Sequence, residues 1–266
     1  MPPKSARPRP AKGFSVVRPT SIEKERREPR PNGSGLHTLA IDVGGTGIKM
    51  IVLDPDGAPI TERSRELTPK PAKPDAVLRV IAKMIEAQPH FDRVSVGFPG
   101  VVIEGVVKTA PNLDNKAWRD RRFQGDLEKL TGVPVRVIND ADLQGYGVID
   151  GKGVELVLTL GTGMGAALFV NGHLVPNLEL GHHPFEKGKT YEERVSDAAL
   201  KRVGKKEWSK RVAGALAQLQ PIFNYETLHL GGGNIASLKI KLPKNVRVFD
   251  NVDGMTGGIR LWDDQG

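Results

Sequence analysis

Two polar side chains stand where an apolar run ends. The run PVRVI closes on Asn139 and Asp140, and a helix-forming stretch follows. If the run is a strand, both side chains lie at a sheet edge, where a fixed aspartate can accept the proton of an attacking hydroxyl and the asparagine can orient that hydroxyl. Both residue types are also favoured helix caps, and we assign Asp142 to capping. The pattern indicates Asp140 as a general base, with helix capping as the alternative.

A glycine-rich turn follows an earlier apolar run. The segment DVGGTGIK joins two apolar stretches. Its glycines let backbone N–H groups approach an anion closely, its threonine adds a hydroxyl donor and its lysine a positive charge. Its aspartate is placed to hold Mg²⁺, directly or through water, against a phosphate. The pattern matches neither GxxxxGK[ST] nor GxGxxG, so an ordinary hairpin is the alternative. The candidate phosphate-binding residues of this turn are Asp42, Gly44, Gly45, Thr46, Gly47 and Lys49.

A second turn of the same form occurs later in the chain. The run VELVLTL leads into Gly161, Thr162 and Gly163. Two facing anion sites are what a transferring phosphoryl group and its leaving group require. A third glycine cluster, residues 231–233, follows the run ETLHL. Gly232 is a further phosphate candidate if this cluster begins a helix, and a tight turn is the alternative.

Three further polar positions could contact a polyol. Glu179 and His182 are three residues apart and together can hydrogen-bond several hydroxyls of one ligand. His183 completes an adjacent histidine pair that could instead bind a metal, although no cysteine or other obvious ligand accompanies it. Asn112 lies in the polar loop PNLDNKAW, where a plain turn role is the alternative.

The elements that must position these residues alternate between strands and helices. Helical spacing occurs at 74–87, 126–132, 189–203, 205–224 and 254–262. Besides the strands around the glycine turns, strands are expected at 58–67, 93–100, 134–140 and 226–230, and RVFDN (247–251) follows. This order predicts an α/β fold, and the repeated strand–turn–strand motif predicts two related lobes with a ligand cleft at the strand ends. We expect a tail at 1–35, an N-terminal lobe at 36–140 rejoined by helix 254–262, and a C-terminal lobe at 141–253.

Composition narrows the class of protein. The 266 residues are 38% hydrophobic and 26% charged, which fits a globular protein. No apolar run approaches the roughly 18–20 residues of a membrane span, and MPPKSARPRP has no apolar secretory core. The absence of cysteine excludes disulfides, thiol catalysis and cysteine-bound zinc. A cytoplasmic enzyme is therefore expected.

The positive charge is concentrated at the N-terminus. Nine Lys or Arg and three Glu within residues 1–35 account for +6 of the formal net charge of +8. The segment is rich in proline and poor in large apolar residues, so burial cannot offset its ordering entropy. We expect a disordered basic tail whose simple role is solubility, with weak capture of a polyanion as the alternative. The tail alone does not make a nucleic-acid binder.

Together these motifs resemble the ROK family of sugar kinases, within the larger actin-like (ribonuclease H-like) phosphotransferase fold. The matching pieces are IDVGGTGIK, GFPG, PNLDNKAW, NDAD, LGTGMG, ELGHH and GGGN, in the family's order, over residues 37–262. The resemblance implies a two-lobed fold with a cleft between the lobes and Mg²⁺ as cofactor. It also implies transfer to the 6-hydroxyl of a hexose, most often glucose, and suggests a homodimer.

The resemblance also implies roles for single residues. Asp140 would be the catalytic base, and the two glycine turns would bind phosphate. The sugar would be held by Asn112, Asn139, Asp140, Glu179 and His182. Most relatives follow ELGH with a cysteine-rich motif in which the histidine binds zinc. Because this chain has no cysteine, that zinc site is excluded and the histidine keeps only its sugar-facing role.

The short form without zinc, with EERVSDAALKRVGKKEWSKRV, resembles the polyphosphate glucokinases, which use inorganic polyphosphate and sometimes ATP. A linear phosphate polymer needs a row of cations. In this segment six cations within eleven residues face only Glu207, and a solvated helix face is the alternative. The candidate polyphosphate track comprises Lys201, Arg202, Lys205, Lys206, Lys210 and Arg211.

Two other activities stay open within the family. The nearest is a strictly ATP-dependent hexose kinase. The other is a sugar-responsive DNA-binding repressor, which would carry an N-terminal helix-turn-helix. Residues 1–35, with six prolines before residue 30, cannot build that motif, so nucleic acid is not the expected partner.

Overall fold

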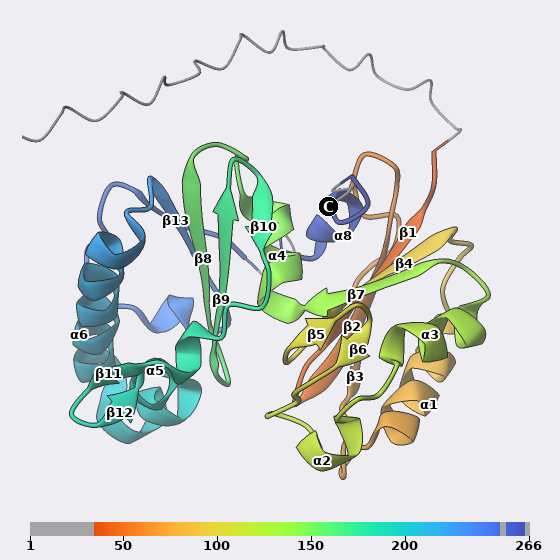
Figure 1. The fold of residues 1–266 in the computed structure, drawn as a ribbon, viewed down its shortest axis with the longest axis horizontal. Helices are drawn as coiled ribbons and strands as arrows, with labels where there is room; N and C mark the ends of the chain where they lie inside the picture. Colours follow the sequence, from red (N-terminus) through yellow and green to blue (C-terminus); the bar gives the residue numbers. More distant parts are fainter. Residues whose placement is uncertain (1–34, 251–253, 264–266) are drawn as a thin grey trace, which may run out of the picture. The chain divides into compact units, whose positions relative to one another are not determined.

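The computed structural model describes residues 35–250 and 254–263, and residues from Gly35 onward form one compact unit (Figure 1). The expected tail at 1–35 lies almost wholly outside the described residues. Two five-stranded sheets organise the unit. Within the described ranges, no helix is long and apolar enough to cross a membrane.

The first sheet has the strand order β3-β2-β1-β4-β7. Its strands are β1 (Thr38–Val43), β2 (Gly47–Leu53), β3 (Ser64–Leu67), β4 (Arg93–Phe98) and β7 (Val135–Asn139). Helices α1 (Pro74–Ile85), α2 (Asn115–Trp118) and α3 (Phe123–Thr131) accompany it, and β5 (Val102–Ile103) pairs with β6 (Val106–Val107) in a small hairpin. We call this part the N-terminal lobe. Strands β1, β2, β4 and β7 are largely apolar because this part of the sheet is covered, whereas the edge strand β3 is polar and mostly exposed. The buried side chains of Phe98, Trp118 and Phe123 pack on one another in the core of the lobe.

Strand direction in this sheet decides where the polar residues go. Strand β1 runs antiparallel to β2 but parallel to β4, and β4 runs parallel to β7. The register pairs Asp42 with Gly97 and Phe98 with Asn139. The carboxyl ends of the three parallel strands therefore meet at one edge, which brings Asp42 and Asn139 together although 97 positions separate them in the sequence.

The second sheet has the strand order β10-β9-β8-β13-β14. Its strands are β8 (Val154–Leu160), β9 (Met164–Val170), β10 (His173–Val175), β13 (Thr227–Gly231) and β14 (Val246–Val248). The strands β11 (Pro184–Glu186) and β12 (Lys189–Thr190), the helices α5 (Tyr191–Val195) and α6 (Asp197–Phe223), and the short 3₁₀ turns η1 (Leu180–His182) and η2 (Ile235–Ser237) complete this part, the C-terminal lobe. Figure 1 shows α6 along its outer side.

Two helices join the sheets. Helix α4 (Asp140–Val148) starts directly at the end of β7, and its Tyr146 packs edge-on against Phe169 of the second sheet. Helix α8 (Gly257–Arg260) returns to the first sheet, where Ser95 donates a 2.6 Å hydrogen bond to the Gly258 carbonyl and the Trp262 indole donates to the Ser95 hydroxyl at 2.8 Å. The carboxyl-terminal segment thus packs on β4.

The expected elements differ from the observed ones mainly at their ends. The helix expected at 126–132 begins at Phe123, and Gly132 ends it in the left-handed conformation. The third strand is confined to Ser64–Leu67, and the last helix is four residues long. Residues 189–190 form a strand rather than the start of a helix, because Thr190 caps α5 with a capping box. Gly204, with φ 76°, interrupts α6 where the sequence predicts a break.

Candidate active site

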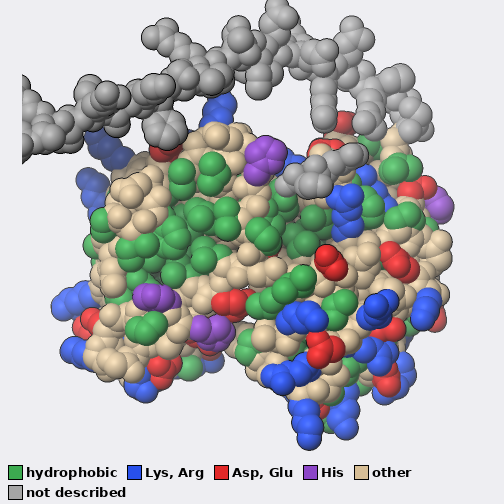
Figure 2. Space-filling model, viewed as in Figure 1, with side chains coloured by type: hydrophobic (Ala, Val, Ile, Leu, Met, Phe, Trp, Pro, Cys, Tyr) green, Lys and Arg blue, Asp and Glu red, His purple; other side chains and the backbone are tan. Residues whose placement is uncertain are grey.

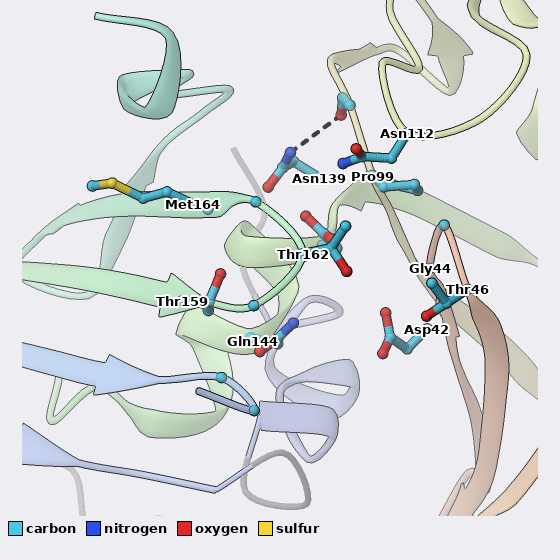
Figure 3. Close-up of a pocket in the computed structure, with 18 of the residues that line it drawn as sticks. Asp42, Gly44, Thr46, Pro99, Asn112, Asn139, Gln144, Thr159, Thr162 and Met164 are labelled. Carbon is cyan, nitrogen blue, oxygen red and sulfur yellow. Dashed lines mark hydrogen bonds between the residues drawn. The ribbon is translucent and has the colours of Figure 1, made fainter. Parts of the chain in front are cut away.

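A cavity of about 560 Å³ lies where the strand ends of the two sheets meet. Every candidate for sugar and phosphate contact lines it. These residues are Asp42, Gly44, Gly45, Thr46, Gly47, Lys49, Asn112, Asn139, Asp140, Gly161, Thr162, Gly163, Glu179, His182 and Gly232. In Figure 3, Asp42 and Thr46 approach the cavity from the first sheet, and Thr159 and Thr162 approach it from the second. The tertiary structure thus gathers segments from six separate parts of the sequence.

Asn139 caps helix α4 and leaves Asp140 out of that role. The side-chain oxygen of Asn139 accepts hydrogen bonds from the backbone N–H groups of Ala141 at 2.8 Å and Asp142 at 3.3 Å, and its amide nitrogen donates to the Gly100 carbonyl at 3.2 Å. Among the described residues, Asp140 accepts a hydrogen bond only from Ala141 N–H, through Oδ1 at 2.9 Å. The capping alternative therefore applies to Asn139, and Asp140 keeps a carboxylate oxygen for the cavity.

The environment of Asp140 disfavours its charged form. Burial comes first, the negative charge of Asp42 second, and Glu179 and Asp142 add to them; together they raise the pKa of Asp140 to about 8 against the opposing hydrogen bond from Ala141 N–H. A carboxyl group with so high a pKa binds a proton readily, as a general base must. Positive charge brought in beside Asp42 would lower the pKa and restore the carboxylate.

The capping role expected for Asp142 is wrong, because Asn139 caps helix α4. Its side chain is 1% exposed, and Oδ2 accepts a 3.1 Å hydrogen bond from Asn177 N–H, while Oδ1 has no partner. Burial, with a smaller contribution from Glu179, raises the pKa of Asp142 to about 7 despite that bond. Asn177 in turn bonds both backbone groups of Val102 at 3.0 Å. Asp142 therefore holds a loop of the C-terminal lobe in place, and this loop contacts the N-terminal lobe through Asn177.

Hydrogen bonds and a close backbone approach define the first glycine turn. Gly44 N–H donates to the Gly47 carbonyl at 2.9 Å, and the Thr68 hydroxyl donates to the Gly44 carbonyl at 2.5 Å. A Cβ on Gly45 would lie 3.0 Å from the Asn112 carbonyl oxygen, so glycine is needed for the Asn112 loop to approach.

The acidic residue of this turn suits a divalent cation. Lys49 Nζ lies 2.6 Å from Asp42 Oδ2, and the carboxylate is mostly buried. Among the residues with described positions, no three His, Asp or Glu side chains gather as a metal site. This donor set fits Mg²⁺, which commonly uses one or two protein carboxylates together with waters and substrate phosphates. Phosphoryl transfer in general needs such a divalent metal, which neutralises charge on the phosphate oxygens.

Hydrogen bonds from neighbouring segments hold the second turn in place. Gly161 N–H donates to the Gly163 carbonyl at 3.0 Å, and the Gly161 carbonyl accepts from Asp197 N–H at 2.8 Å and the Asn234 side chain at 3.1 Å. A Cβ on Gly161 would meet no protein atom within 4 Å, because that position faces the cavity. A ligand can therefore approach this backbone closely.

The third glycine cluster forms a tight turn rather than a helix start. Only the 3₁₀ turn η2 follows it, and Gly232 has φ +98°. A Cβ there would lie 2.4 Å from the Leu160 carbonyl oxygen. The cluster packs closely against the second turn, and Gly232 lines the cavity as well.

Glu179 and His182 face the cavity as a pair. His182 Nε2 lies 3.4 Å from Glu179 Oε2. Burial raises the pKa of Glu179, with the charge of Glu192 adding to it and His182 opposing it. His183 points elsewhere, because its Nδ1 lies 2.8 Å from the Pro184 carbonyl. The two histidines do not converge on one point, and the metal alternative raised for them gains no support from this part of the structure.

The six cations of the candidate track do not line the cavity. Lys201 comes nearest, since it pairs at 2.6 Å with Asp197 of the cavity wall. Lys205, Lys206 and Lys210 are exposed on α6. Arg211 is only 12% exposed and pairs with Glu207, so it presents little positive charge to solvent.

Several cavity residues were not predicted from the sequence. Arg63 and Arg65 enter from β3 and the residue before it, and Gln144 enters from α4. Glu192 also lines the wall, and its Oε2 accepts Met164 N–H at 3.1 Å. The alternating arginines of the segment ERSRE, beside a glycine turn, could have been recognised in the sequence as candidate cavity residues. Nothing local marks Gln144 or Glu192, which depend on helix packing.

Two sheets with facing glycine turns, and an aspartate of raised pKa between them, define the class: an actin-like (ribonuclease H-like) two-lobed phosphotransferase. Comparison with known proteins agrees. The ROK family model matches residues 38–191. A polyphosphate glucokinase from Mycobacterium tuberculosis is 36% identical over 87% of this chain and 89% of that protein.

Solved structures place the fold in the same group. An inorganic polyphosphate/ATP-glucomannokinase from Arthrobacter sp. strain KM matches with TM-score 0.77 and 33% identity, over 87% of this chain and 100% of that one. A ROK family glucokinase from Streptomyces griseus, solved with glucose and AMPPNP, matches with TM-score 0.72 and 20% identity over 85% and 98%, which bears on the fold alone. The chain belongs to the ROK family.

Proposed function

We propose that this protein transfers a phosphoryl group from inorganic polyphosphate, and also from ATP, to the 6-hydroxyl of glucose. The observation that carries the proposal is the position of Asp140, a carboxyl group of raised pKa in one cavity with both glycine turns. The donor is assigned from the polyphosphate glucokinase and the polyphosphate/ATP-glucomannokinase that the chain is similar to.

The acceptor side of the reaction uses the residues around Asp140. The sugar lies against Asn112, Glu179 and His182, which present hydrogen-bonding groups to its hydroxyls. The side-chain amide of Asn139 already bonds three backbone groups, so it contributes mainly by fixing the start of α4. Asp140 takes the proton from the 6-hydroxyl oxygen as that oxygen attacks phosphorus and the bond to the leaving phosphate breaks.

The donor side uses the two turns. Backbone N–H groups of residues 45–47 and 162–163, with the hydroxyls of Thr46 and Thr162, hold the transferring phosphoryl and the leaving phosphate, because the N–H groups of Gly44 and Gly161 close the turns themselves. Mg²⁺, held through Asp42 and the phosphates, supplies positive charge against the phosphate oxygens. Lys49, paired with Asp42, adds a fixed cation beside it.

We also propose that exposed cations of α6 contribute to binding the polymer. Lys201 adjoins the cavity through Asp197, and Lys205, Lys206 and Lys210 continue along the helix. Neutralising Lys201, Lys205 and Lys206 together should raise KM for polyphosphate more than KM for glucose. Equal effects on both would indicate an ordinary solvated helix face.

The decisive experiment measures glucose 6-phosphate formed from glucose, Mg²⁺ and purified long-chain polyphosphate with ATP absent. Turnover is expected. Turnover with ATP but none with polyphosphate would establish the strictly ATP-dependent alternative.

A cytoplasmic location and a homodimer stay predictions, which fractionation and sedimentation would test. The alternative of nucleic-acid binding depends on residues 1–35, and almost all of these lie outside the described ranges.

A further inference from the structure

The charged residues of the cavity wall are unevenly divided between the lobes. The cations that line it come from the first three strands of the N-terminal lobe and the approach to them: Lys49, Arg63 and Arg65. The wall on the C-terminal lobe instead carries the carboxylates Glu179, Glu192 and Asp197. A polyanion longer than the transferred group would be repelled by the second wall and attracted by the first.

The two arginines lie where an extended anion would pass. Arg65 stands opposite Lys49 in the register of β2 and β3, so two positive side chains are cross-strand neighbours. The Arg65 side chain also crosses the first glycine turn, since a Cβ on Gly47 would lie 2.7 Å from Arg65 Nε. Like charges directly opposite each other are unfavourable. Asp42 offsets the charge of Lys49, whereas Arg65 has no described acidic partner. Arg63, two residues earlier, follows the same alternation of faces.

Neither arginine has another task among the described residues. Both are exposed, and neither makes an ion pair with the described Asp or Glu side chains. Lys49, in contrast, already neutralises Asp42. The arginines thus present uncommitted guanidinium groups, whose planar donors suit phosphate oxygens.

A second hollow of about 480 Å³ lies on the next part of the chain. It is lined by residues 69–79, which directly follow β3, and its cations are Lys70, Lys73 and Arg79. Lys70 Nζ lies 3.0 Å from the Gly45 carbonyl, which ties the hollow to the first glycine turn. Its one acidic residue, Asp75, pairs with Arg121 at 3.1 Å. Figure 2 shows Lys and Arg side chains gathered over the lower part of this lobe, with acidic ones among them.

We propose that Arg63 and Arg65, continued by Lys70 and Lys73, form the subsite for the part of the polyphosphate chain beyond the transferred phosphoryl group. This inference rests on the proposed function and places the polymer on the N-terminal lobe. On this inference the cations of α6 make at most a minor contribution to binding the polymer. A donor of few phosphates ends near the two glycine turns, whereas a long chain reaches the arginines at the cavity wall and the lysines beyond them, so the subsite discriminates donors by length.

The test compares three charge-neutralised variants of the full chain. R63Q/R65Q removes the proposed subsite, K205Q/K206Q removes the middle of the α6 track, and K83Q/K129Q removes two exposed lysines that line neither hollow. KM is measured for long-chain polyphosphate, tripolyphosphate, ATP and glucose. Circular dichroism and thermal unfolding establish that each variant is folded.

R63Q/R65Q should raise KM for long-chain polyphosphate at least about tenfold, a loss of two charge-assisted contacts. KM for glucose should change less than about twofold, because the sugar contacts are untouched. The preference of the wild type for long chains over tripolyphosphate should disappear, a readout that a merely structural role would not move. K83Q/K129Q should match the wild type. An unchanged KM for long chains in R63Q/R65Q, or an equal rise for tripolyphosphate, would overturn the inference.

Failure of the proposed function has a different signature. If the wild type does not turn over polyphosphate, binding of long-chain polyphosphate is measured by calorimetry at low salt. Binding that R63Q/R65Q abolishes, and that K83Q/K129Q keeps, would support the subsite without the reaction. Equal binding by all variants, or no binding by the wild type, would reject the subsite.

Discussion

Replacing Asp140 by asparagine separates a catalytic role from a structural one. The asparagine keeps an oxygen that can accept the Ala141 N–H bond and leaves the Asn139 cap of α4 intact, so the backbone should not move. It cannot accept a proton. Positioned general bases contribute about 10²–10⁴ in rate, so turnover should fall at least about 100-fold, equivalent to about 2.7 kcal/mol or more in the barrier.

Stability should change in the opposite direction. The pKa of Asp140 is about 8 in the folded protein and near 3.8 when unfolded, so its ionisation opposes folding. The wild type is therefore stabilised at low pH and loses that stability as pH rises through about 8. The full shift would correspond to about 6 kcal/mol, an upper bound that solvent in the cavity and bound cations reduce. We expect D140N to gain about 1–3 kcal/mol at pH 8.5, and less as pH falls toward 4.

Two assays check both effects on the same preparations. Glucose 6-phosphate formation is followed with glucose and long-chain polyphosphate, and the free energy of unfolding is taken from denaturant titrations at pH 5 and pH 8.5. Asp150→Asn is the matched control, because Asp150 is half-exposed and pairs with Arg247 away from the cavity. Turnover in D140N within about tenfold of the wild type, or a loss of stability at pH 8.5, would refute the reasoning.

Three further substitutions test other parts of the site. Asp142→Asn removes a buried charge of pKa about 7 while keeping an acceptor for Asn177 N–H, so unfolding free energy should rise about 1–3 kcal/mol at pH 8 and the gain should vanish below about pH 4; destabilisation at pH 8 would contradict this. Gly161→Ala adds a methyl group that meets no protein atom, so stability should hold while donor KM rises at least about tenfold; an unchanged donor KM would remove this turn from the phosphate site. Gly232→Ala places Cβ 2.4 Å from the Leu160 carbonyl oxygen at φ +98°, so a thermal melt should show a loss of at least about 1–3 kcal/mol, and wild-type stability would mean that the turn relaxes.

Much of the fold was predictable because its signals are local. The apolar residues of the runs LAIDV and VELVLTL indicate buried strands. The glycines after them indicate turns whose backbone conformation other residues would adopt only with strain. The interruption of the long helix at Gly204 was equally local. Asp140 could be nominated because it follows a buried strand directly, and it lines the cavity; its role as the base stays a prediction.

Tertiary structure decided the rest, because burial and charge act through space. The pKa of Asp140 depends on Asp42, 98 positions earlier, and on Glu179, and no local pattern contains that proximity. The sequence analysis assigned helix capping to Asp142, which is wrong: packing left Asn139 as the cap, Asp140 in the cavity and Asp142 buried against Asn177.

The cations show the same division. Composition counts positive charges along the chain, and it marked α6, where six of them are close in sequence. Folding turned most of these toward solvent and brought Arg63 and Arg65 to the cavity wall instead. Residue type and local order thus determine which groups are available. Which of them share a low-dielectric cavity depends on strand direction and lobe packing, which exist only once the chain is folded.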